Sequence, residues 1–287
     1  MAFASPMQKL QDWFTQQWVI IRGRKINLVE HAWLIGPFGK VGGIGGAFID
    51  QLAETEGLIV RRGEDSGGLI PSISNLDLSE GELSRLSKPV INFYENTASH
   101  SLSLSVNWNP FFRGFGILTN KLFSNRIDQL NIPTRNLEDS ESLTSEIIAL
   151  IDPASNETRY TIWFRTVQSS GQVVYSGVYG TCTLPSGKTG IRAVFPLPNG
   201  NATVLMIPEV GENGELILES AGKGFGDAGF YFLLEDSRGN LWSQFIRSFR
   251  DRLTVHSGGD HLVAEQELTL FKFRVVTFTY RIVRKET

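Results

Sequence analysis

The chain has 287 residues, of which 41% are hydrophobic and 20% charged, and its formal net charge is −3. This composition is typical of a globular protein with a sizeable core, and the small negative charge gives no global attraction to nucleic acid or to an anionic membrane. The single cysteine, Cys182, excludes an intrachain disulfide and a zinc site built on paired cysteines.

The first residues, MAFASPMQKLQDWF, lack the basic stretch and apolar run of a signal peptide. No part of the chain approaches the roughly 18 consecutive apolar residues of a transmembrane helix. We therefore expect a soluble, cytoplasmic protein without a transmembrane segment and without a nucleic-acid partner.

Helices and loops are expected in residues 1–140. A first helix follows Pro6, a residue suited to the first helical position, and places its apolar side chains on one face. A second, short helix (AFIDQLAETEG) ends at Gly57. A third covers residues 80–96, where Pro89 should break it into two pieces.

One strand is expected in this part of the chain, because residues 101–108 alternate between polar and apolar side chains. Pro110 then opens a further predicted helix, FFRGFGILTNKLFSNRI.

From about residue 141 to the end the pattern has a period of two. Eleven candidate strands follow one another, separated by turn residues such as Asn199-Gly200 and Asn213-Gly214. Short, evenly spaced strands of this kind predict antiparallel pairing. A sheet with so many strands should close into a barrel or split into packed sheets.

The predicted fold class is α+β, with N-terminal helices packed on a large antiparallel β-barrel or strongly curved β-sheet. Residues 1–140 form a mainly helical segment with one strand, which covers the β-rich body of residues 141–287 within one integrated domain. The alternative is a START-like helix-grip fold. That fold needs a long C-terminal helix, whereas this chain ends in RVVTFTYRIV, which alternates as a strand.

The run Gly224-Phe225-Gly226-Asp227-Ala228-Gly229 has the G-x-G-x-x-G spacing of dinucleotide-binding loops. Such a loop needs a helix directly after it, because the free N–H groups of the helix bind the phosphates. The residues that follow, GFYFLLED, indicate a short strand instead. We therefore expect a turn and no cofactor; the second glycine cluster, residues 36–46, lacks the Gly-Lys-Ser/Thr of a phosphate-binding loop.

Three residues are weak candidates for catalysis. Glu95 lies where the third helix gives way to a strand, so it could act as an acid or base at the mouth of a cavity. His256 and His261 stand within six residues of each other with Asp260 between them, but the sequence offers no obvious further metal ligand, and we expect no metal site.

Arginines among the predicted strands are the candidate ligand-binding residues. An inward-facing guanidinium could hold a carboxylate or phosphate by paired hydrogen bonds, whereas an outward-facing one would be an ordinary surface residue. The sequence does not fix the strand registers. The candidates are Arg165, Arg192, Arg247 and Arg252, together with the aromatic residues Trp163 and Tyr94.

Three stretches, INFYENT, FPLPNGNATVLMIPE and GKGFGDAGFYF, resemble a family of uncharacterised bacterial proteins of about 290 residues. The resemblance extends from LIGPFGKVGGIGGAF to the C-terminus. It implies no activity, cofactor or catalytic residue.

The leading hypothesis is that the β-body binds a small apolar or amphipathic, lipid-like ligand in a cavity, with one or two arginines as a polar anchor. A cofactor-independent enzyme that uses a cavity carboxylate or histidine is one alternative. A protein-interaction module with no small ligand is the other. A cavity over about 300 Å³ would favour the ligand-binding hypothesis. A carboxylate–histidine or carboxylate–arginine pair in that cavity would favour the enzyme. A filled core with an exposed apolar patch would favour the interaction module.

Overall fold

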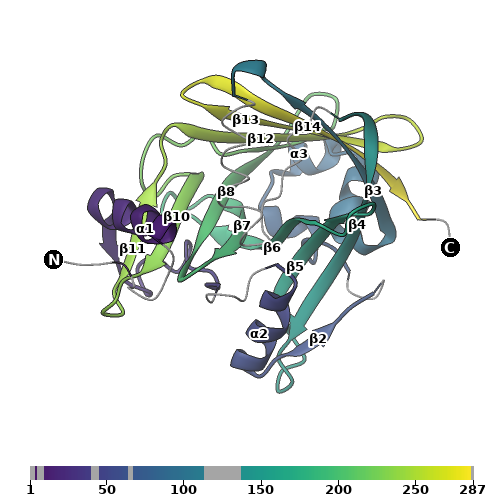
Figure 1. Cartoon of the computed structure of the whole chain (residues 1–287). Coiled ribbons are helices and arrows are strands. Elements are labelled where there is room, and N and C mark those ends of the chain that lie inside the picture. Colours follow the sequence, from purple (N-terminus) through teal and green to yellow (C-terminus); the bar gives the residue numbers. More distant parts are fainter. Residues whose placement is uncertain (1–3, 5–9, 40–44, 64–66, 113–136, 286–287) are drawn as a thin grey trace.

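The computed structural model describes residue 4 and residues 10–39, 45–63, 67–112 and 137–285. Its centre is a closed antiparallel β-barrel of ten strands (Figure 1). Around the barrel the strands run in the order β3, β4, β5, β6, β7, β8, β9, β12, β13 and β14, and β14 pairs with β3. Their bounds are β3 His100–Trp108, β4 Leu137–Ile151, β5 Thr158–Val167, β6 Val173–Thr183, β7 Thr189–Leu197, β8 Gly200–Val210, β9 Leu216–Glu219, β12 Phe249–Ser257, β13 Leu262–Leu270 and β14 Phe273–Arg284.

The predicted fold class is confirmed: helices from the N-terminal part pack on an antiparallel barrel. Each of the eleven candidate strands is a strand, β4 to β14. The C-terminal segment is the strand β14, which pairs with β13 and β3 and closes the barrel at a position where the helix-grip alternative requires a helix.

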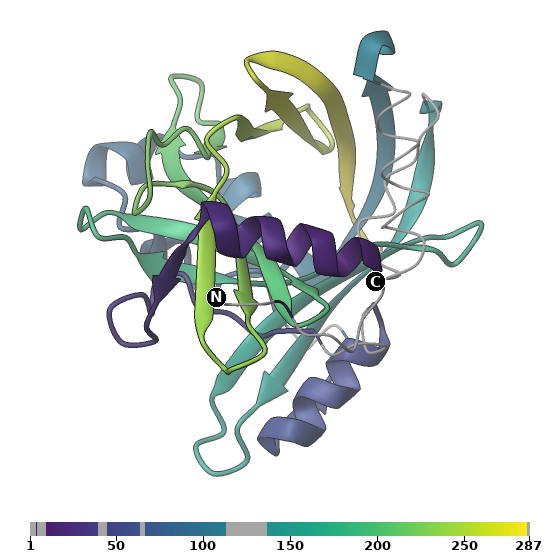
Figure 2. The same ribbon diagram turned by 60° about the vertical axis from the view of Figure 1, so that its left-hand side comes forward.

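The strand β8 divides the sheet, because its two halves pair with different strands. Residues 200–205 pair with β10 (Gly229–Glu235), whereas residues 207–210 pair with β9. The hairpin of β10 and β11 (Leu241–Phe245), extended by β1 (Arg24–Ile26), therefore leaves the barrel as a side sheet. The helix α1 (Leu10–Arg22) lies along this side sheet in Figure 2.

A second helix, α2 (Ala47–Glu56), covers the outer wall of the barrel. Its side chains Phe48, Ile49 and Leu52 pack against β4, β5, β6 and β7 from outside, because every second residue of those strands points outward. The short strand β2 (Ile59–Arg61) then pairs with β4. The sequence predicted neither β1 nor β2.

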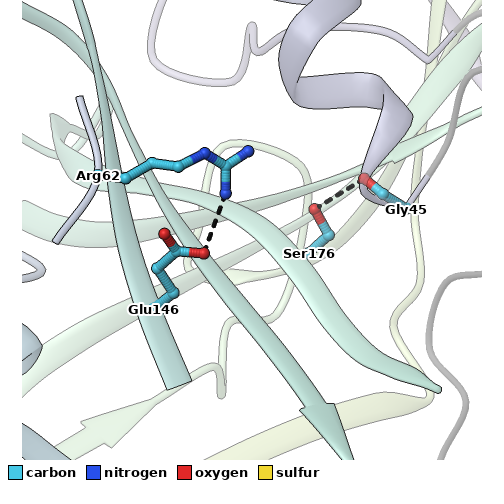
Figure 3. Close-up of polar contacts among 4 residues, drawn as sticks. All are labelled: Gly45, Arg62, Glu146 and Ser176. Atoms are coloured by element: carbon cyan, nitrogen blue, oxygen red, sulfur yellow. Dashed lines mark hydrogen bonds and ion pairs between the residues drawn. The ribbon is translucent and has the colours of Figure 1, made fainter. Parts of the chain in front are cut away.

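Two polar contacts attach this covering segment to the wall (Figure 3). Ser176 on β6 donates its hydroxyl to the carbonyl oxygen of Gly45, 3.3 Å away, just before α2. Arg62, just after β2, forms an ion pair with Glu146 on β4, with 3.0 Å between Nη1 and Oε2. The covering segment is thereby held at both of its ends.

Helices from the N-terminal part also extend the core of the barrel interior. The predicted third helix is two helices, α3 (Glu80–Arg85) and α4 (Lys88–Glu95), and Pro89 stands in the first turn of the second, as expected. The 3-10 helices η2 (Ile73–Leu76) and η3 (Thr97–Ser99) flank them. Their buried side chains form one continuous apolar cluster with the inward-facing residues of the barrel.

The helix predicted after Pro110 falls mostly outside the described residues. Residues 110–112 are helical, and the remainder of FFRGFGILTNKLFSNRI is not described.

Candidate functional site

A cavity of about 70 Å³ lies inside the barrel. Its wall is mostly apolar, and its polar side chains are contributed by α4, β5, β6, β12, β13 and β14. The polar and charged members are Tyr94, Trp163, Arg165, Tyr175, Tyr179, Asp251, Gln266 and Tyr280.

Arg165 is a buried cation in this wall. It stands on β5, two residues after Trp163 and two before Val167, so that all three face the interior. Only 5% of Arg165 is exposed. Its guanidinium carbon lies 3.9 Å from the ring centroid of Trp163 and 4.5 Å from that of Tyr175, and these rings offset part of the cost of burying the charge.

The hydrogen-bonding capacity of Arg165 is largely unused. Its Nη2 donates to the hydroxyl of Tyr179 over 3.4 Å, a long hydrogen bond. Its buried Nε has no hydrogen-bond partner, and among the described residues Arg165 forms no ion pair. A buried donor of this kind is costly when it is left unpaired, and it is a ready partner for an anion.

Asp251 is the acid of the cavity. It stands on β12 with 5% exposure, and burial raises its pKa to about 7, although a hydrogen bond from Gln266 opposes the rise. Nε2 of Gln266 donates to Oδ2 of Asp251 over 2.8 Å, whereas the buried Oδ1 has no partner. Main-chain and hydroxyl contacts with Ser220 hold Asp251 in place.

The tyrosines around these two groups are neutral. Burial raises the pKa of Tyr94, Tyr175 and Tyr179, and it raises that of Tyr280 to about 12 although the charge of Arg165 opposes the rise. Among the residues that line the cavity, Arg165 is therefore the single permanent cation and Asp251 the single carboxyl group.

The three candidate residues Trp163, Tyr94 and Arg165 line the same cavity, and the other arginines do not. Arg192, on the outer face of β7, donates to the carbonyl oxygens of Ala32, Trp33 and Ile35 at 3.1, 3.3 and 2.6 Å. It fixes the segment after β1 to the wall.

The remaining two arginines are exposed. Arg247 was expected on a strand, but it lies in the turn between β11 and β12, because the pairing of β11 ends at Phe245. Arg252 is on β12, and its side chain faces away from the cavity toward Glu219, with 3.6 Å between Nη1 and Oε1.

The candidate catalytic residues Glu95, His256 and His261 lie outside the cavity wall. Glu95 ends α4 as expected, and its Oε1 accepts a hydrogen bond of 2.7 Å from the main-chain nitrogen of Ile73. His261 pairs with Asp260 in the exposed turn between β12 and β13. No group of three or more metal-ligating side chains occurs in the described part of the chain.

The glycine run 224–229 is a turn into a strand. Its N–H groups are used internally, since Asp227 accepts hydrogen bonds from the main chain of Lys223 and Gly224, and the Tyr231 hydroxyl accepts one from Gly226. The strand β10 begins at Gly229, where a Cβ atom would lie 2.3 Å from the ring of Phe245. The absence of a side chain at Gly229 therefore allows the backbone to approach this ring closely.

Cys182 is half-buried among apolar residues, and burial raises the pKa of its thiol. A thiol in this state is a packing residue and a poor nucleophile.

The carboxyl group that lines the cavity together with Arg165 was not predicted from the sequence. Asp251 stands two and four positions before Leu253 and Val255, and the alternation along β12 turns all three inward. A strand taken to begin at Phe249 would have revealed Asp251 on the apolar face.

No protein-family model, curated protein or solved structure matches this chain. Its function must therefore be inferred from the cavity.

Within the described residues, no helix is both long and apolar enough to cross a membrane.

Exposed apolar side chains gather on one face of α1. Phe14, Trp18 and Ile21 are 60%, 43% and 71% exposed, and their spacing places them on adjacent turns of the helix. The opposite face, with Val19 and Ile20, packs on the side sheet.

Proposed function

We propose that the protein binds a small amphipathic molecule inside its barrel, with Arg165 holding the polar end of that molecule. The unpartnered Nε of this buried arginine carries the proposal, because Arg165 lines the cavity and its Nε finds no acceptor among the described residues. Bidentate hydrogen bonding to an oxygen-rich group is the chemistry for which a guanidinium is suited.

The apolar end of the ligand would lie against the aliphatic and aromatic wall, which includes Phe195, Val204 and Met206. The cavity of about 70 Å³ is well below the roughly 300–1,000 Å³ of pockets for drug-sized ligands. The proposed occupant is therefore a molecule with a short apolar part; a full lipid chain would require the wall to move.

Isothermal titration calorimetry with straight-chain acids, alcohols and amides of two to twelve carbons would test this proposal. We expect saturable 1:1 binding whose affinity rises about fourfold with each methylene, as burial of about 0.8 kcal/mol per CH₂ predicts. The rise should stop where the chain outgrows the cavity. Absence of binding for every compound, together with no bound molecule in native mass spectra of the purified protein, would refute the proposal.

Two matched substitutions separate the cavity from the surface. Arg165→Met removes the buried guanidinium, and Arg247→Met removes an exposed one of the same size. Binding should be weakened roughly 10- to 100-fold in the first variant and unchanged in the second. Equal binding by both would show that the ligand lies elsewhere.

A second candidate function is acid–base catalysis by Asp251 on the bound molecule. The observation that favours it is that Asp251 shares the cavity with Arg165 and has a pKa of about 7, a value suited to proton transfer at neutral pH. Incubation with a small-molecule cell extract would test it: mass spectrometry should find a compound consumed by the wild type and spared by Asp251→Asn. If both consume the same compounds, Asp251 has no catalytic role.

The interaction-module alternative would use the exposed face of α1. Sedimentation velocity would detect self-association, and Trp18→Gln combined with Phe14→Gln should abolish it. A wild type that stays monomeric at high concentration would count against that use of the helix.

We also propose a cytoplasmic location, which the absence of any disulfide-forming cysteine pair supports. Cell fractionation with an antibody would test it.

A further inference from the structure

We infer that the ligand of the barrel cavity is a carboxylate monoanion, and that Asp251 takes up one proton when this ligand binds. The inference rests on the proposed function, because it names the chemical class of the molecule that Arg165 holds.

The charges of the cavity wall favour a single negative charge on the ligand. With Asp251 ionised, Arg165 and Asp251 together are neutral, and the wall contributes no other charged side chain. A carboxylate that enters would leave one uncompensated negative charge in a space shielded from water, which is costly. Protonation of Asp251 removes that charge, whereas a dianion such as phosphate would still leave one behind.

The unpaired atoms of the wall match a carboxylate. Nε of Arg165 needs an acceptor, and one carboxylate oxygen supplies it. Oδ2 of Asp251 is already occupied by Gln266, so the free Oδ1 is the atom that carries the new proton and donates it to the second oxygen. The proton comes from solvent, and no covalent bond in the ligand changes.

Among the side chains that line the cavity, Asp251 is the one that can change its charge near neutral pH. Gln266 from β13 bonds its side chain, and Ser220 after β9 bonds its main chain. The other titratable or charged side chains that line the same cavity are Tyr94, Arg165, Tyr175, Tyr179 and Tyr280. The tyrosines stay neutral and the arginine stays charged over this pH range. The raised pKa of Asp251, about 7, agrees with this assignment.

Calorimetric titration of butyrate into the wild-type protein tests the inference. The same titration in two buffers with different ionisation enthalpies gives the number of protons taken up per ligand bound. We expect close to one proton at about pH 8, where Asp251 starts ionised, and close to none at about pH 5.5, where it is already protonated. The affinity for butyrate should fall about tenfold for each pH unit above about 7.

Asp251→Asn provides the matched control, because an amide keeps the shape and cannot titrate. The variant should bind butyrate without proton uptake and with an affinity independent of pH. Butyramide, which is neutral, should bind the wild type weakly at both pH values.

The outcomes distinguish the two proposals. Butyrate binding at about pH 8 without proton uptake, or butyramide binding as tightly as butyrate, overturns the inference and leaves the proposed function standing. If neither butyrate, butyramide nor the longer acids and alcohols bind, the proposed function itself fails. The measurement on the wild type decides the question even if Asp251→Asn does not fold.

Discussion

Arg165 and Arg192 stand two strands apart in the same barrel, yet their surroundings differ. Arg192 faces outward and donates to three carbonyl oxygens of the segment that crosses the wall. Among the described residues, Arg165 faces inward, donates one long hydrogen bond to Tyr179, packs on the rings of Trp163, Tyr175 and Tyr280, and has an unpartnered Nε. The outer arginine has three carbonyl acceptors, whereas the described residues offer the inner one only a distant tyrosine hydroxyl and leave its Nε available for a ligand.

The largest effect on stability is expected for Arg192→Met. Its loss leaves the carbonyl oxygens of Ala32, Trp33 and Ile35 without their charged donor, and hydrogen bonds to charged groups contribute about 1.5–3 kcal/mol each. The free energy of unfolding should fall by about 3–5 kcal/mol, as measured by urea denaturation. A smaller loss than that of Arg165→Met would contradict the contrast between the two arginines.

Asp251→Asn should change how stability depends on pH. The pKa of Asp251 is raised in the folded protein, from 3.8 to about 7, so the folded state holds this proton more tightly than the unfolded state does. The resulting stabilisation is full below about pH 4 and is lost as the pH rises through about 7, up to about 4 kcal/mol. The variant should therefore lack this loss.

Thermal unfolding from about pH 4 to 8 measures this difference. The melting temperatures of the wild type and the variant should converge at low pH, and the variant should have the higher melting temperature above about pH 7. Parallel pH profiles would show that Asp251 titrates at its usual value.

Arg165→Met should change binding more than stability. Removal of a buried, poorly paired charge is often neutral or stabilising, so the free energy of unfolding should change by less than about 1 kcal/mol. The affinity for a short carboxylate should fall roughly 10- to 100-fold, because the charge-assisted hydrogen bond from Nε of Arg165 is lost. Calorimetry and urea denaturation of the same sample measure both quantities.

Gln266→Leu should have a smaller effect. The hydrogen bond from Gln266 lowers the pKa of Asp251, so its loss raises that pKa above the wild-type value. Proton uptake on butyrate binding should then begin at a higher pH than in the wild type, because Asp251 stays protonated to a higher pH before the ligand binds. An unchanged pH dependence would show that Gln266 does not tune the carboxyl group.

Arg247→Met should have the smallest effect, within about 0.5 kcal/mol of wild-type stability and with no change in binding. Arg247 is exposed in a turn, so its substitution removes no hydrogen bond or ion pair to a described residue. A substantial loss of stability in this variant would show that exposure is a poor guide to the roles of these arginines.

Much of the fold could be predicted from the sequence, because strand alternation and turn residues are local signals. They gave all eleven strands of the β-rich body, the break at Pro89 and the turn before Gly229. The division of β8 between β9 and β10 could not be predicted, because pairing between distant strands leaves no local pattern. The short strands β1 and β2 escaped for the same reason.

The site was predictable only in part. Arg165, Trp163 and Tyr94 could be named from their aromatic surroundings, but the direction of each arginine depends on the register of its strand, and a shift of one residue reverses it. Arg165 and Arg192 illustrate this, since both sit among apolar residues and only one faces the cavity. Asp251 was overlooked because it lies close to the start of its strand, which begins at Phe249, and the ends of strands are hard to place from sequence.

The most direct test of the central claim is the NMR signal of the Arg165 Nε–H group, assigned by its absence from Arg165→Met. The unpartnered, buried Nε predicts a slowly exchanging proton whose resonance moves as butyrate is added, with the same saturation curve as the calorimetric binding. A resonance that stays in place while butyrate saturates the protein would contradict the claim that Arg165 holds the ligand.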